Sequence, residues 1–115
     1  MENKENLVDV QLIRDMLYDD DGYVKEFSNA SIQSFGEFKQ HFKESLLARE
    51  MDELRRAGHK IKPVAMMLKL DPVIEMYDTS KTYLEENRST EELADLADDM
   101  ETYCDTVIAE FQELV

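Results

Sequence analysis

Apolar side chains recur at alternating steps of three and four residues along most of the chain, which is the spacing of one face of an α-helix. The longest of these stripes contains Val24, Phe27, Ser31, Phe35, Phe38, Phe42 and Leu46. A strand would instead alternate every second residue, so this stripe predicts a long amphipathic helix. The 115 residues include only three Gly and two Pro, which leaves little turn-rich material for a β fold.

Four further stripes predict four more helices. They cover residues 7–17, 51–68, 73–84 and 93–114. Asp71 followed by Pro72 predicts a helix start, with Asp71 as the N-cap and proline at the first helical position. Ser89 and Glu92 have the Ser-x-x-Glu spacing of a capping box. Long helices joined by short loops favour antiparallel neighbours, so we expect one all-α domain over residues 1–115. Its architecture would be an up-and-down antiparallel four-helix bundle with a short additional N-terminal helix.

The overall charge excludes several classes of partner. The chain has 13 Lys and Arg against 27 Asp and Glu, a net charge of −14, so we expect no nucleic acid and no membrane as partners. No run of about 20 apolar residues is present for a membrane span. Residues 1–6 lack the basic and apolar parts of a secretory signal. The single cysteine, Cys104, falls at a core position and suits a reducing compartment, so we expect a cytoplasmic protein.

One window interrupts the acidic pattern. Residues 54–70 contain no Asp or Glu and have His59 near their centre. The basic residues of this window are Arg55, Arg56, Lys60, Lys62 and Lys69. Positive charges near an imidazole favour its neutral form, which has a free nitrogen lone pair. The same charges can hold an anion beside the ring, so the window predicts a phosphoryl acceptor.

Helical geometry places His59 at the edge of the apolar stripe. Gly58 and Ile61 belong to that stripe, and His59 is rotated by about 100° from Gly58, so we expect its side chain to face outward. Lys62 lies one turn later on the same face. Gly58 leaves little bulk beside the ring, which would let a partner approach closely. An exposed histidine on a basic helix end, without further function, is the alternative.

Residues 54–68 resemble the phosphorylation helix of histidine-containing phosphotransfer (HPt) domains. They begin with Leu-Arg-Arg-Ala-Gly-His-Lys-Ile-Lys-Pro. The motif of that family has five consecutive positions, which are His, any residue, an aliphatic residue, Lys and Gly. A Leu-Gly pair follows later in the same helix. His59 matches the phosphorylated histidine, Ile61 the aliphatic residue, Lys62 the lysine and Leu68 the later leucine. The order of the predicted helices over residues 7–114 is also similar to that of HPt domains.

Two residues depart from the family pattern. Pro63 stands where the family usually has glycine, and Lys69 replaces the glycine after the leucine. Proline at position 63 removes the hydrogen bond to the His59 carbonyl and predicts a kink near the site. Like glycine, it has no flexible side chain that could cover the imidazole. Lys69 extends the basic surface toward a partner.

The resemblance implies a phosphorelay intermediate that carries a phosphoryl group on His59 between aspartate-bearing receiver domains of a two-component system. Lys62, helped by Lys60, would neutralise the phosphoryl oxygens. We expect contacts with the partner from Arg55, Arg56, Gly58, Pro63, Met66 and Lys69. The implied partners are response-regulator receiver domains and a hybrid sensor histidine kinase. The family further implies no kinase or phosphatase activity, and no cofactor on this chain, because magnesium belongs to the receiver. We expect a monomer.

Two other hypotheses remain open from the sequence. A helical adaptor that transfers nothing could dock an acidic partner through the same basic residues around His59. The chain could also be a folded part of a larger hybrid sensor kinase. A buried imidazole would exclude the phosphorelay hypothesis, because a buried His59 could not accept a phosphoryl group.

The remaining candidate residues have structural interpretations. His41 lies among phenylalanines and resembles no motif, so we interpret it as a histidine at the edge of the core. Asp19–Gly22 is too poor a match for a calcium loop, because Leu17 and Ser28 fall where such a loop needs Asp and Glu. We interpret this cluster as a helix stop and N-cap. No His and Cys spacing suits zinc.

Overall fold

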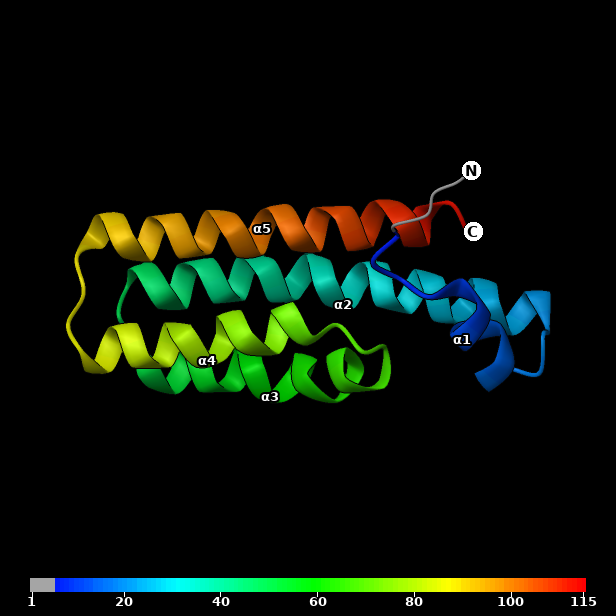
Figure 1. Ribbon diagram of the computed structural model, residues 1–115, viewed down its shortest axis with the longest axis horizontal. Helices are drawn as coiled ribbons and strands as arrows, with labels where there is room; N and C mark the ends of the chain where they lie inside the picture. The colour runs from blue at the N-terminus through cyan, green and yellow to red at the C-terminus, as the bar shows by residue number, and fades with distance from the viewer. Residues whose placement is uncertain (1–5) are drawn as a thin grey trace.

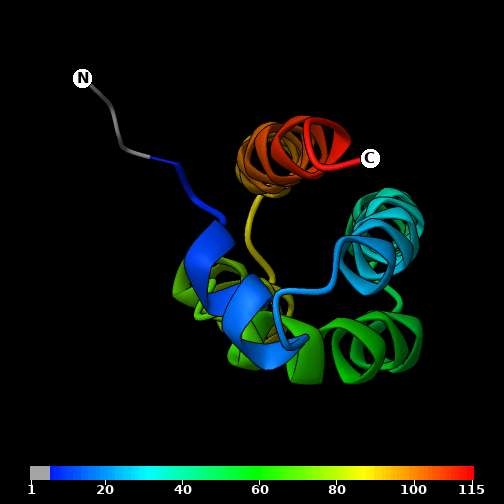
Figure 2. The same ribbon diagram turned by 90° about the vertical axis from the view of Figure 1, so that its right-hand side faces the viewer.

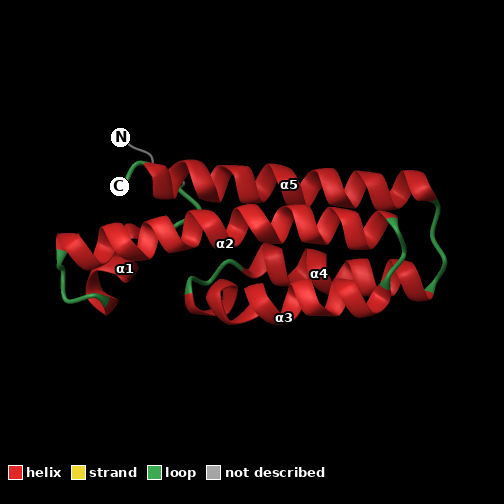
Figure 3. Cartoon of the chain, turned by 180° about the vertical axis from the view of Figure 1, so that it is seen from behind, coloured by secondary structure: helices red, strands yellow, loops and turns green. Residues whose placement is uncertain are grey.

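The computed structural model describes residues 6–115, which form five α-helices and no strand (Figures 1 and 3). The helices are α1 (Val10–Met16), α2 (Asp21–Leu47), α3 (Met51–Met67), α4 (Asp71–Glu85) and α5 (Thr90–Gln112). The all-α prediction is therefore confirmed for this part of the chain. Residues 1–5, which belong to the segment without a predicted secretory signal, lie outside the described residues.

The helices pack as a bundle. Helix α2 contacts both α3 and α5, and α4 also contacts both of them. The two longest helices, α2 and α5, lie side by side, while α3 and α4 cover one half of α2 and α1 lies beside its other half (Figure 1). The loops before α3 and before α5 are at one end of the bundle. The turn between α3 and α4 is at the opposite end of these two helices (Figure 1). No helix in residues 6–115 is long and apolar enough to cross a membrane.

The core is built from the stripes that the sequence predicted. Phe35, Phe42 and Leu46 of α2 are fully buried, and Phe27 meets Phe111 of α5 edge-on, with ring centroids 6.0 Å apart. Cys104 is also fully buried, as predicted. Burial raises the pKa of its thiol to about 12, so the thiol stays protonated at neutral pH and contributes as a small apolar side chain.

The N-terminal segment is fastened to α5 by a carboxylate. The Glu110 side chain accepts hydrogen bonds from the backbone N–H of Leu7 at 3.1 Å and of Val8 at 2.7 Å. The side chains of Val8 and Ile13 are buried in the same core as α2 and α5. These contacts hold α1 against the half of α2 that α3 and α4 leave uncovered.

Two of the predicted helix starts are confirmed. The Ser89 hydroxyl accepts from the Glu92 N–H at 3.1 Å, and Glu92 Oε1 accepts from the Ser89 N–H at 3.2 Å, which completes the capping box. The hydrogen bond from the Ser89 backbone lowers the pKa of Glu92 most, and the hydrogen bond from the Arg88 side chain lowers it further. The Glu92 contribution to stability is therefore present above the usual carboxyl pKa and is lost as the pH falls through the lowered value. Asp20 caps α2 by accepting from the Tyr23 N–H at 3.0 Å.

The prediction that Asp71 caps α4 is wrong. Leu70 occupies the N-cap position, Asp71 is the first helical residue, and the cap has no side-chain hydrogen bond. The reason lies one residue earlier, because Lys69 adopts a left-handed backbone conformation with φ of 59°. This turn lets the Leu70 N–H donate to the Ala65 carbonyl at 2.8 Å and buries the Leu70 side chain.

Replacing Ser89 by alanine tests the capping box. We expect Ser89→Ala to lower the free energy of unfolding by about 1 kcal/mol, because the Glu92 N–H loses its acceptor. Chemical denaturation measures this change. Ser34→Ala is the matched control, since Ser34 is exposed within α2 and alanine favours a helix interior. Equal effects of the two substitutions would contradict the assignment of the cap.

Candidate functional site

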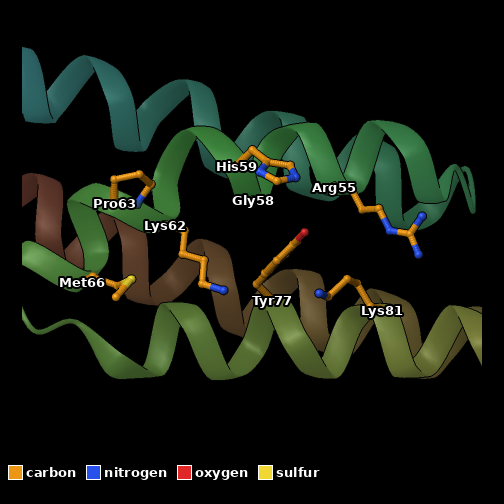
Figure 4. A pocket seen from close by; sticks show the side chains of 8 residues that line it. All are labelled: Arg55, Gly58, His59, Lys62, Pro63, Met66, Tyr77 and Lys81. Carbon is orange, nitrogen blue, oxygen red and sulfur yellow. The ribbon is translucent and has the colours of Figure 1, made fainter.

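His59 is exposed on α3 and faces the groove between α3 and α4 (Figure 4). The outward position predicted from the helical spacing is confirmed. Within residues 6–115 the imidazole makes no hydrogen bond or ion pair with another side chain, whereas His41 Nε2 lies 3.1 Å from Glu53 Oε1. The His59 ring nitrogens are thus accessible to a molecule outside the chain.

The groove is formed by two helices. Its volume is about 580 Å³. It is lined by Arg55, Gly58, His59, Lys62, Pro63 and Met66 of α3 and by Tyr77 and Lys81 of α4. Six of the site residues predicted from the sequence therefore line one groove, and α4 adds two residues that the sequence did not indicate as part of the site.

Tyr77 fixes the spacing of the two helices. Its ring lies directly over Gly58, where an added Cβ would be 2.1 Å from Tyr77 Cζ and 2.3 Å from Cε1. The space beside Gly58, which we expected to serve a partner, is filled by this ring of the same chain. Gly58 is buried as a result. The missing side chain at position 58 therefore lets α4 approach α3 and places the tyrosine next to His59.

Positive charge enters the groove from both helices. The amino groups of Lys62 and Lys81 point toward the space around the Tyr77 ring from its two sides (Figure 4). Lys81 Nζ lies 4.6 Å from the ring centroid, within the range of a cation–π contact. It is also 3.6 Å from Asp78 Oδ1, in a pair that is partly exposed to solvent.

The Tyr77 hydroxyl is a hydrogen-bond donor at neutral pH. Burial raises its pKa, and the nearby positive charge of Arg55 lowers the pKa by a smaller amount. The net direction is upward, so the hydroxyl keeps its proton well above neutral pH. In Figure 4 it points across the groove toward α3. The groove therefore presents cations and one hydroxyl donor around the His59 imidazole.

Three predicted residues lie outside this groove. Lys60 lines a separate pocket of about 120 Å³ between α2 and α3, together with His41. Arg56 Nη1 lies 3.3 Å from Glu53 Oε2 on the same helix. Lys69 is in the turn after α3. All three side chains are exposed and add positive charge around the site without lining it.

The structure adds Tyr77 and Lys81, which sequence reasoning missed as site residues. Tyr77 belongs to the predicted apolar stripe of residues 73–84, and Lys81 lies four residues later on the same face. The only signal in the sequence was Gly58, because a glycine in a buried stripe indicates close approach by a bulky neighbour. The identity of that neighbour depends on which helix faces packs there, and periodicity does not specify it.

Pro63 does not end the helix. Helix α3 continues through it to Met67. Figure 2, which looks along the bundle, shows the last turns of α3 running sideways toward the start of α4, as expected for a proline kink. The kink brings Pro63 and Met66 to one end of the groove (Figure 4).

The described residues contain no cluster suited to a metal ion. No group of three or more His, Cys, Asp or Glu side chains in residues 6–115 is arranged to bind one. The acidic cluster Asp19–Gly22 instead contains the start of α2. Comparisons with known protein families, curated proteins and solved structures give no match.

Gly58 in α3 and Gly36 in α2 provide a matched test of the Tyr77 contact. We expect Gly58→Ala to lower the free energy of unfolding by about 1–3 kcal/mol, because the new methyl group collides with a rigid ring. Gly36→Ala in α2 has no atom within 4 Å of the new Cβ and should raise the free energy by about 0.5–1 kcal/mol. Chemical denaturation of both variants measures the difference. If both substitutions stabilise the chain, Tyr77 does not pack on Gly58.

Proposed function

We propose that this chain is a phosphorelay intermediate that carries a phosphoryl group on His59 between aspartate-bearing receiver domains of a two-component system. The observation that carries the proposal is an exposed imidazole with no side-chain partner among residues 6–115, facing a groove that contains Lys62 and Lys81. A buried or hydrogen-bonded His59 would have argued against transfer. The resemblance of residues 54–68 to the HPt phosphorylation helix supports the same proposal.

Phosphoryl transfer depends mainly on positioning and on neutralising the charge of the phosphoryl oxygens. In the proposed reaction, a neutral ring nitrogen of His59 attacks the phosphorus of a receiver's aspartyl phosphate. A nitrogen–phosphorus bond forms, the phosphorus–oxygen bond breaks, and the receiver carboxylate leaves. The reverse reaction passes the group to a second receiver. The amino groups of Lys62 and Lys81 would hold the transferring oxygens, and magnesium would be supplied by the receiver.

The surface around His59 suits an acidic protein partner. Met66 is 60% exposed at the apolar end of the groove, and Arg55 lies at the other end. The exposed side chains of Arg56, Lys60 and Lys69 extend the positive charge beyond the groove. Such a field attracts the acidic active site of a receiver over a distance of about 10 Å at ordinary salt.

The fold is compatible with an HPt domain. An up-and-down antiparallel arrangement of α2 to α5, with α1 as the additional short helix, agrees with the contacts between these helices. Lys69, which replaces the family's glycine, adopts a left-handed conformation with φ of 59°, a conformation that glycine adopts readily. A cytoplasmic, monomeric protein is part of the same proposal.

The phosphoacceptor role is tested by phosphotransfer from receiver domains of the same genome, each phosphorylated on its aspartate with a small phosphodonor. We expect at least one receiver to transfer an acid-labile label to the wild-type chain and to the His41→Gln control, but not to His59→Gln. The label should be lost because glutamine has no nucleophilic ring nitrogen. Label that persists on His59→Gln, or the absence of transfer from every receiver, would contradict the proposal.

The same variants separate transfer from simple docking. A helical adaptor would bind and signal normally with His59→Gln and would lose both with charge reversal at Arg55 or Lys62. The proposed intermediate keeps receiver binding with His59→Gln but loses transfer. Binding is measured in parallel by titration of the receiver against each variant.

A further inference from the structure

The groove between α3 and α4 has two chemically different ends (Figure 4). Pro63 and Met66 lie at one end, and Met66 is one of the most exposed large apolar side chains of the described residues. Arg55 and Lys81 lie at the other end, and Lys62 and Tyr77 stand between the two ends. A ligand that fills the groove would therefore meet apolar atoms at one end, and positive charge in the middle and at the other end.

The charged part of the groove selects an anion. Its lining includes Arg55, Lys62 and Lys81, and no Asp or Glu. One carboxylate competes for this charge, since Asp78 Oδ1 lies 3.6 Å from Lys81 Nζ in a partly exposed pair. Partly exposed pairs of this kind are weak and exchange readily for a stronger anion. A phosphate dianion offers three acceptor oxygens and a higher charge than a carboxylate.

The size of the groove argues for more than a free phosphate ion. A volume of about 580 Å³ is in the usual range for sites that hold small organic molecules. The exposed Met66 side chain and the Pro63 ring offer an apolar surface that an inorganic ion cannot use. Methionine adapts its shape to varied apolar ligands and makes favourable contacts with aromatic rings.

We propose that the groove binds an organic phosphate monoester without any covalent step. The phosphate would lie beside the Tyr77 hydroxyl, which can donate a hydrogen bond, and the amino groups of Lys62 and Lys81 would reach it from the two sides of the ring. The apolar or aromatic body of the ester would cover Pro63 and Met66. This binding site needs neither a receiver nor phosphorylation of His59, so it stands independently of the phosphorelay proposal.

Phenyl phosphate is the probe for this site, titrated into the unphosphorylated full chain and followed by two-dimensional NMR. We expect saturable shifts confined to α3 and α4, with an affinity at least about tenfold higher than that of inorganic phosphate or of phenol. Each of these two compounds supplies only half of the interaction. Equal affinity for phenyl phosphate and phenol would contradict the phosphate contact. Equal affinity for phenyl phosphate and inorganic phosphate would contradict the apolar contact.

A pair of double variants with the same change in net charge completes the test. Lys62→Gln with Lys81→Gln removes both amino groups that face the groove and should lower the affinity at least about tenfold. Lys60→Gln with Lys69→Gln removes two exposed cations outside the groove and should change it less than about twofold. Similar losses in both double variants, or no saturation at millimolar phenyl phosphate, would overturn the proposal. No receiver is present, so failed phosphotransfer cannot be mistaken for failed binding.

Discussion

The contact between the Tyr77 ring and the Gly58 backbone determines the geometry of the whole site. A Cβ at position 58 would be 2.1 Å from the ring, so the two helices can pack at this distance only with glycine there. The ring packs on the apolar stripe of α3 at Gly58. The next residue, His59, points away from the core because each helical residue is rotated by about 100° from the one before it. The same contact sets Lys81, one turn after Tyr77, opposite Lys62. The convergence of the cations thus follows from this contact, and the exposure of the imidazole follows from the helical rotation.

Electrostatics then distinguishes this face from the rest of the molecule. The chain carries a net charge of −14, yet the groove around His59 is lined by three basic side chains and no acidic one. Such a separation favours the approach of an acidic group at this one face. Because salt screens exposed charges within about 10 Å, this attraction is strongest at low ionic strength. A receiver's aspartyl phosphate and a small phosphate ester are both suited to this field.

The sequence predicted those features that depend on one helix at a time. The apolar spacing identified the buried face of α2, Ser89 and Glu92 identified a helix start, and the rotation from Gly58 predicted the exposure of His59. Features that depend on two segments were missed. Lys81 reaches the groove only because α4 packs on α3, and Lys60, one residue past His59, turns toward α2 instead. The predicted Asp71 cap was displaced by the left-handed turn at Lys69, which is unusual for a lysine.

Phosphorylation of His59 is the step on which the proposed function depends. It is tested most directly by peptide mapping of the wild-type protein after phosphotransfer, using tandem mass spectrometry under alkaline conditions that preserve phosphohistidine. We expect a single phosphate on the peptide that contains His59, with none on His41 or on any carboxylate. Phosphate on His41, or on an aspartate with His59 unmodified, would contradict it.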